Sequence, residues 1–144
     1  MSEASRVDAL YREVVLEHYR HPRGRAPLAA PDASAVVDNP VCGDQVKVEV
    51  CLAGGRIESV SARARGCAIA VASASVLTEM VPGLGREACD ALGESLARLV
   101  EGGPAGADLD ERLAAFERIA DLPSRRRCAT LPWEALHETW PPPR

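Results

Sequence analysis

One cysteine of this 144-residue sequence lies in a bend with a carboxylate close beside it. Cys42 stands between Pro40, which blocks regular strand pairing, and Gly43, which lets the chain turn. Asp44 follows two residues after the thiol, so both side chains can point at one centre. A cysteine and a carboxylate at this spacing make half of a tetrahedral metal site.

Two further cysteines lie at the expected starts of helices. Cys67 follows Gly66 and opens a long apolar segment, and Cys128 comes just before the last helical segment. Unpaired backbone N–H groups and the positive end of the helix dipole favour thiolate there, which is the form that binds metal and attacks sulfur. If these segments converge, four side chains form a Cys₃Asp set that suits Zn²⁺: Cys42, Asp44, Cys67 and Cys128.

Spacing alone leaves a second interpretation of these cysteines open. The long gaps between them match no compact zinc-finger pattern, and a free cysteine is often just a small buried apolar residue. Cys51 falls on the polar face of a strand pattern and Cys89 on a helical core stripe, so neither is expected to bind metal. For the histidines we expect capping or surface roles at helix ends rather than metal binding: His18, His21 and His137.

A dense basic run, Arg125 to Arg127, directly precedes Cys128. One interpretation is a solvated turn. The other is an electropositive rim that stabilises thiolates and docks an acidic surface of a partner, with Arg125 and Arg127 as the binding residues.

Composition narrows the class of protein. The 17 basic and 21 acidic residues give a net charge of −4, which argues against binding to nucleic acid or to an anionic membrane. No apolar run suits a signal peptide or a membrane span, so we expect a cytoplasmic protein whose cysteines stay reduced. The 47% hydrophobic content is enough for one domain over residues 1–144, with a core at about 7–140.

Alternating apolar residues predict a small antiparallel sheet in the middle of the chain. Period-two patterns indicate strands at 35–37, 46–52 and 57–64, with a tight turn at Gly54-Gly55 and a bulge near Glu58 and Ser59. Apolar residues at helical spacing predict five helices, at about 7–18, 67–80, 88–100, 109–120 and 129–139. Pro132 is expected in the first turn of the last helix, which Pro141 to Pro143 should end. The expected class is α+β, with about three antiparallel strands and helices packed on one face.

Several short motifs together resemble the IscU/SufU family, also called the NifU N-terminal domain family. The resemblance runs in order from about Leu10 to Leu136. The motifs that carry it are Leu10-Tyr11-Arg12, His18-Tyr19, Pro22-Arg23, Asn39-Pro40-Val41-Cys42-Gly43-Asp44, Gly66-Cys67-Ala68-Ile69, Ala72-Ser73-Ala74-Ser75, and Cys128-Ala129-Thr130-Leu131 with Trp133.

Two features favour the SufU branch of that family over the scaffold branch. They are the extra segment at about 102–121 and Arg127, which stands where scaffold members carry histidine. The resemblance implies an IscU/SufU-like fold and Zn²⁺ held by Cys42, Asp44, Cys67 and Cys128. It also implies persulfide sulfur accepted from a pyridoxal-phosphate cysteine desulfurase of the SufS type, for a downstream iron–sulfur assembly scaffold.

Three functions follow as hypotheses. The first is a zinc-dependent sulfurtransferase in which Cys42, in its mobile bend, receives the sulfur while Cys67 and Cys128 at helix starts remain ligands. The second is a scaffold on which the same residues assemble a [2Fe–2S] cluster for apo-proteins. The third is a partner-binding adaptor whose zinc is purely structural. These alternatives leave open whether the protein is an enzyme.

Overall fold

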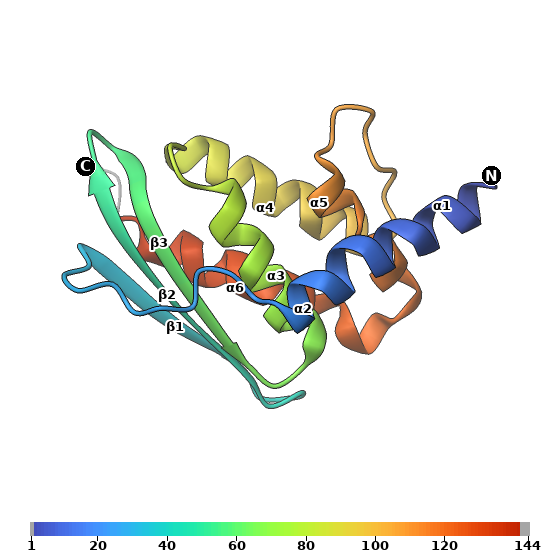
Figure 1. Ribbon diagram of the computed structural model, residues 1–144, viewed down its shortest axis with the longest axis horizontal. Coiled ribbons are helices and arrows are strands. Elements are labelled where there is room, and N and C mark those ends of the chain that lie inside the picture. Colours follow the sequence, from blue (N-terminus) through green and yellow to red (C-terminus); the bar gives the residue numbers. More distant parts are fainter. Residues whose placement is uncertain (1, 142–144) are drawn as a thin grey trace.

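The computed structural model describes residues 2–141 and places a three-stranded antiparallel sheet against a group of helices (Figure 1). The α+β class predicted from the sequence is therefore confirmed. Met1 and residues 142–144 lie outside the described residues, and so do two of the three prolines expected to end the last helix. Within residues 2–141, no helix combines the length and the apolar character needed to cross a membrane.

The sheet consists of β1 (Ala33–Asn39), β2 (Asp44–Ala53) and β3 (Arg56–Arg65), in that order across the sheet. Alternate β2 side chains, such as Val46 and Val48, are fully buried on the face toward the helices. The predicted bulge is present, because Ser59 pairs with Cys51 and Ile57 with Leu52, which leaves Glu58 as the extra residue.

Two helices cover the inner face of this sheet. α3 (Ala68–Met80) packs on β3, and α6 (Arg126–Thr139) crosses β1 and β2. α3 is apolar nearly all round and nine of its residues are buried, as the sequence predicted. α4 (Arg86–Val100) packs on the far side of α6, as Figure 1 shows.

The outer face of the sheet is crossed by the chain that links the first helices to β1. Figure 1 shows this connection running over the strands. Outer-face side chains hold it: Glu49 accepts from the Leu28 N–H at 3.4 Å, and Arg63 Nη1 donates to the Arg25 carbonyl at 3.4 Å. Glu49 is consequently only 7% exposed and pairs with Arg63 at 3.3 Å.

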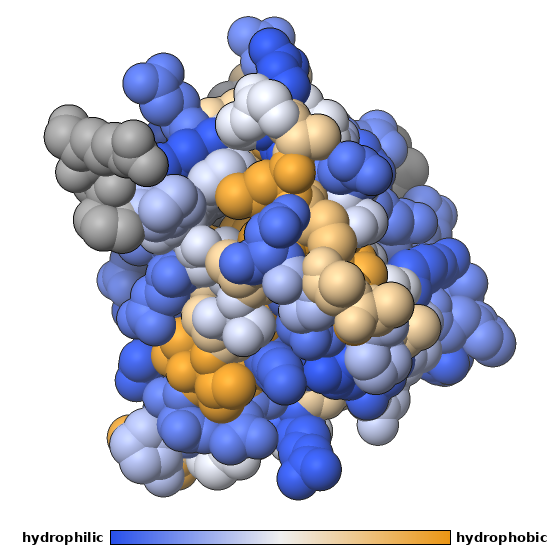
Figure 2. Space-filling model, turned by 90° about the vertical axis from the view of Figure 1, so that its left-hand side faces the viewer, coloured by the Kyte–Doolittle hydropathy of each residue, from blue (hydrophilic) through white to orange (hydrophobic). Residues whose placement is uncertain are grey.

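The surface of the molecule carries both apolar and hydrophilic side chains. Figure 2 shows the side that lies to the left in Figure 1, where apolar patches are separated by hydrophilic side chains. Such scattered apolar groups are usual on a soluble surface and indicate no function by themselves.

The N-terminal helix begins earlier than its apolar pattern. α1 (Glu3–Leu10), the π-helical segment η1 (Tyr11–Leu16) and α2 (Glu17–Arg20) follow one another directly. Ser2 caps α1 by accepting a hydrogen bond from the Ser5 N–H at 3.1 Å. Residues 3–6 lie before Val7, the first residue of the apolar pattern, so helical spacing could not reveal this first turn.

The prediction of one helix over residues 109–120 is wrong. α5 (Glu111–Ala114) is a single turn, and a 3₁₀ segment, η2 (Glu117–Asp121), follows it. Leu113, Phe116 and Ile119 are all fully buried. Leu113 lies in α5, Phe116 in the turn between the two segments and Ile119 in η2, so the change from α-helix to 3₁₀-helix keeps the apolar residues of both segments in the core.

The predicted start of the last helix is also wrong. A 3₁₀ turn, η3 (Pro123–Arg125), leads straight into α6, which begins at Arg126. Pro132 therefore lies inside the helix rather than in its first turn, and Cys128 lies within the first turn rather than before it. Because Pro132 has no N–H, it cannot donate to the carbonyl of Cys128, four residues earlier.

Candidate metal centre

Three segments that are far apart in sequence meet at the lower end of the molecule in Figure 1. They are the turn between β1 and β2, the link from β3 to α3, and the start of α6. Antiparallel pairing brings the first two segments together, because Asn39 is opposite Asp44 and Gln45 is opposite Arg65. The same pairing places Cys67, two residues beyond Arg65, next to Asp44.

Three of the four predicted ligands form one cluster. The Sγ atoms of Cys42 and Cys128 and a carboxylate oxygen of Asp44 all lie within 4.8 Å of one another. Ligand atoms about 2.0–2.3 Å from one tetrahedral ion would lie roughly 3.3–3.8 Å apart, so a small contraction brings this cluster to metal-binding distance. Cys128 is fully buried and Asp44 is 1% exposed, whereas Cys42 is partly exposed.

The carboxylate of Asp44 fits a bound cation. Its Oδ1 accepts a hydrogen bond from the Cys67 N–H at 2.7 Å. Its Oδ2 is buried and has no hydrogen-bond partner among the described residues. An unpaired buried carboxylate oxygen is costly, and a soft cation held by thiolates and one carboxylate would remove that cost.

Cys67 lies beside this cluster but outside it. Its thiol instead caps α3, where Sγ accepts from the Ile69 N–H at 3.4 Å. Burial raises the pKa of the Tyr11 hydroxyl in η1, and the charge of Cys67 raises it further. From the sequence, Tyr11 was predicted only as part of the first helix and of the Leu10-Tyr11-Arg12 motif. Helical spacing does not indicate which distant residue a side chain approaches.

Gly66 makes room for the Asp44 carboxylate. Its φ angle is +113°, a region that side chains disfavour, and a Cβ atom at this position would overlap Asp44 Oδ1. From the sequence, Gly66 was interpreted only as the residue before Cys67, although a glycine at that point can indicate a close approach of the backbone to another group.

The three arginines before Cys128 have different surroundings. Arg126 pairs with Glu101 at 3.6 Å and Arg127 with Glu134 at 3.4 Å. Arg125 is exposed and forms no ion pair with a carboxylate in residues 2–141. The negative charges of the nearby thiolates, that of Cys67 first, raise the pKa of Arg125.

Burial and charge both disfavour ionisation of Cys128 in the absence of a cation. Burial raises the pKa of its thiol, and the adjacent Asp44 carboxylate and Cys67 raise it further. A group of buried, mutually repelling anions of this kind is stable only with a proton or a cation among them.

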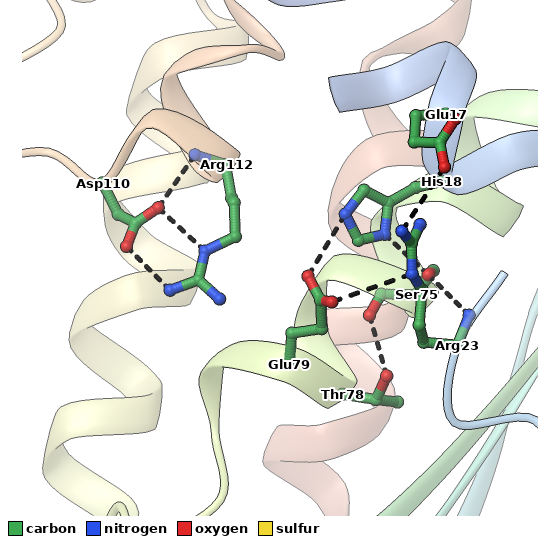
Figure 3. Close-up of polar contacts among 8 residues, drawn as sticks. All are labelled: Glu17, His18, Arg23, Ser75, Thr78, Glu79, Asp110 and Arg112. Atoms are coloured by element: carbon green, nitrogen blue, oxygen red, sulfur yellow. Dashed lines mark hydrogen bonds and ion pairs between the residues drawn. The ribbon is translucent and has the colours of Figure 1, made fainter. Parts of the chain in front are cut away.

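The remaining cysteines and the histidines lie away from the cluster. Cys51 Sγ donates to the Ala30 carbonyl at 3.4 Å on the outer face of the sheet. Cys89 is buried in α4, and burial raises its pKa to about 11. The surface role expected for His18 is wrong: this side chain is 5% exposed and contacts Ser75 Oγ at 2.7 Å and Glu79 at 3.2 Å (Figure 3).

The fold is a small antiparallel sheet packed against helices. At one end, a strand turn and the start of a helix bring thiols and one carboxylate together. This combination is typical of small proteins with a thiolate metal site. Among known protein families, residues 10–97 match the model of the NifU-like N-terminal domain. This chain belongs to that family.

Relatives within the family carry different functional names. The chain is 33% identical over 141 residues to the zinc-dependent sulfurtransferase SufU of Bacillus subtilis, covering 96% of this chain and 94% of that protein. It is also 33% identical over 136 residues to the iron–sulfur cluster assembly scaffold protein IscU of Streptococcus pyogenes, covering 93% and 84%.

Solved structures show the same fold. The N-terminal NifU-like protein of Brucella abortus matches with a TM-score of 0.79 and 26% identity, over 92% of this chain and 93% of that chain. The SUF-system assembly protein of Fervidobacterium islandicum matches with a TM-score of 0.82 and 21% identity, over 91% and 96%.

Proposed function

We propose that this protein is a zinc-dependent sulfurtransferase that carries sulfur on Cys42 for iron–sulfur cluster assembly in the cytoplasm. Zinc would be held by four residues: Cys42, Asp44, Cys67 and Cys128. The observation that carries the proposal is the cluster of Cys42, Asp44 and Cys128, in which Asp44 Oδ2 is buried and has no hydrogen-bond partner among residues 2–141. The name of the Bacillus subtilis relative supports zinc and sulfur transfer as the chemistry.

The unequal burial of the thiols supports Cys42 as the acceptor. Cys128 is fully buried within the first turn of α6, and Cys67 caps α3. Cys42 is partly exposed and makes one long contact, with the Ser124 carbonyl at 3.5 Å. Its thiol can therefore leave the cluster without opening the core or uncapping a helix.

Bound zinc would supply the means to keep these thiols deprotonated at neutral pH. Asp44 and Cys128 are buried, so their side chains have little freedom to move away from the site. Cys67 would exchange its contact with the Ile69 N–H for the cation. Arg125 is exposed in the turn before Cys128, and its positive charge would offset the negative charge of the thiolates.

The transfer is a displacement at sulfur. The Cys42 thiolate attacks the outer sulfur of a cysteine persulfide on the donor protein, and a new S–S bond forms. The bond between the two donor sulfurs breaks, and the donor cysteine leaves with the electron pair as a thiolate. No net oxidation or reduction occurs, and any proton on the outer sulfur stays with it. The donor class is a pyridoxal-phosphate cysteine desulfurase of the SufS type, and the recipient is a downstream iron–sulfur scaffold.

A scaffold function is the second candidate. The Streptococcus pyogenes relative, equally identical to this chain, is named a scaffold protein, and the same thiols could hold a [2Fe–2S] cluster. A purely structural zinc would fit less well, because structural sites are closed and Cys42 is partly exposed.

Metal analysis of the protein purified without added metal separates the candidates. We expect about one zinc per chain and a colourless solution, because three soft thiolates and one carboxylate suit tetrahedral Zn²⁺. Stoichiometric iron with acid-labile sulfide and visible charge-transfer bands would favour the scaffold function instead.

A further inference from the structure

The most exposed large apolar side chain in residues 2–141 is next to the proposed acceptor thiol. Val41 is 89% exposed, compared with 50% for Val36 and 43% for Leu122. A single exposed apolar residue is ordinary on a protein surface. The local backbone of Val41, however, is held in place by several specific contacts.

The turn that carries Val41 is fixed by its neighbours. Asn39 is buried, and its Oδ1 accepts a hydrogen bond from the Val41 N–H at 3.3 Å. The Asn39 carbonyl accepts a second bond from the Gly43 N–H at 2.8 Å, and Gly43 adopts a φ of +74°. Pro40 adds a fixed φ of its own. Val41 is thus presented to solvent by a backbone that would lose little freedom on binding.

A second exposed segment lies against this turn. Cys42 Sγ contacts the carbonyl of Ser124, which belongs to the 3₁₀ turn that follows Leu122. The Arg125 N–H donates to the Leu122 carbonyl at 2.8 Å, so Leu122 and Arg125 are the two ends of one tight turn. The exposed turn that carries Leu122 and Arg125 therefore lies against the Cys42 thiol, next to Val41.

We propose that Val41, Leu122 and Arg125 form a docking surface for the persulfide donor. The donor would offer an apolar recess to Val41 and Leu122 and a carboxylate to Arg125. This inference rests on the proposed function, because sulfur exchange requires bonding contact with Cys42 Sγ. A protein that reaches this thiol must cover the residue before it. The apolar side chains of Val41 and Leu122 and the charge of Arg125 would then determine which donor protein binds.

The test compares two sulfur sources with the zinc-loaded full chain. One source is the cognate cysteine desulfurase with cysteine, and the other is a small-molecule persulfide such as glutathione persulfide. The variants are Val41→Asp, Val41→Ala and the control Val36→Asp, which also adds a charge to an exposed valine. We expect Val41→Asp to raise the KM for the desulfurase at least tenfold and Val41→Ala to raise it less. Labelling by the small persulfide should be unchanged, and Val36→Asp should match the wild type.

Other outcomes separate the docking surface from the proposed function. Wild-type KM in both Val41 variants would overturn the docking surface while leaving sulfur transfer intact. An equal loss with both sulfur sources would also overturn it, because it would indicate damage to the site rather than to docking. If wild-type protein took sulfur from neither source, the proposed function itself would fail, and the docking surface with it.

Discussion

The two oxygens of Asp44 have different neighbours, and that difference links a loop to the candidate metal centre. Oδ1 accepts from the Cys67 N–H and so fixes the start of α3 against β2. Oδ2 has no hydrogen-bond partner among the described residues, and a carboxylate oxygen of Asp44 lies within 4.8 Å of the Cys42 and Cys128 thiols. One carboxylate can therefore position a helix and bind a cation at the same time.

Removing this carboxylate should weaken zinc binding while all thiols remain. We expect Asp44→Ala to lower zinc affinity by at least roughly tenfold, since loss of even an indirect partner of a metal ligand costs about that much. Competition with a chromophoric chelator measures the affinity. Asp38→Ala removes an exposed carboxylate that contacts only Gln45 and serves as the control. Unchanged zinc affinity in Asp44→Ala would show that the Cys₃Asp assignment is wrong.

Cys42 and Asp44 could be predicted as ligands because the signals for them lie close together in the sequence. Pro40, Gly43 and the two-residue step from Cys42 to Asp44 are visible in one short stretch. The different surroundings of Arg125 and Arg127 were not visible, because the partner of Arg127 is Glu134, seven residues on, and the helix that joins them begins earlier than predicted. The effect of Cys67 on the pKa of Tyr11 was not visible either, because the two residues are far apart in the sequence.

At the scale of elements, the link between β3 and α3 has room for glycine only. Gly66 allows the chain to leave the sheet with φ at +113° and to pass directly over the Asp44 carboxylate. This link sets the distance between the strand that carries Asp44 and the helix that Cys67 caps.

Adding a methyl group there should damage both fold and site. We expect Gly66→Ala to lower the free energy of unfolding by about 1–3 kcal/mol from backbone strain alone, with more lost as Asp44 is displaced. Zinc affinity should fall as well. Urea denaturation of the zinc-free protein measures the first effect. Gly106→Ala is the matched control, since Gly106 has no neighbour within 4 Å and no strained φ. Equal stability of the two variants would contradict this role for Gly66.

The element boundaries that the sequence missed share a physical cause. A proline inside a helix normally marks a first turn, so Pro132 indicated a start near 129. The helix nonetheless begins at Arg126, because η3 feeds into it and its following residues, such as Leu131 and Trp133, pack into the core. Tertiary burial outweighs the hydrogen bond that Pro132 cannot make.

At the scale of the whole molecule, a partly buried polar network joins the N-terminal helix to α3 (Figure 3). The Arg23 N–H donates to Ser75 Oγ at 2.8 Å, so the Ser75 hydroxyl is free to donate to His18 Nδ1. The remaining proton of a neutral His18 then lies on Nε2, facing Glu79. Each contact is satisfied when the imidazole is neutral.

This network should make stability depend on pH. Burial lowers the pKa of His18, and Arg23 and Arg112 act in the same direction, whereas Glu79 and Glu17 oppose them. The unfolded chain therefore binds a proton more readily, and stability should be full above the unfolded pKa of about 6.5 and fall as the pH drops below it. Urea denaturation at a series of pH values should show this slope in the wild type and in His21→Gln. His18→Gln should have a smaller slope, and an unchanged slope in that variant would contradict the account.

The general architecture followed from the sequence because its signals were periodic. Alternation of Val46, Val48 and Val50 predicted a half-buried strand, and the apolar run of α3 predicted a buried helix. The crossing of the outer sheet face was not predictable, because residues 25–31 carry no periodic pattern and are held by single contacts from Glu49, Cys51 and Arg63. His18 was misassigned for the same reason: its partners come from α3, more than fifty residues away.

The most direct test of the proposed function is to locate the transferred sulfur. The zinc-loaded protein is incubated with its cognate desulfurase and cysteine, alkylated and digested, and the peptides containing Cys42, Cys67 and Cys128 are compared by mass spectrometry. We predict one added sulfur on Cys42, because its thiol is partly exposed while Cys128 is buried and Cys67 caps a helix. Sulfur found preferentially on Cys67 or Cys128, or full transfer by Cys42→Ala, would contradict the proposal.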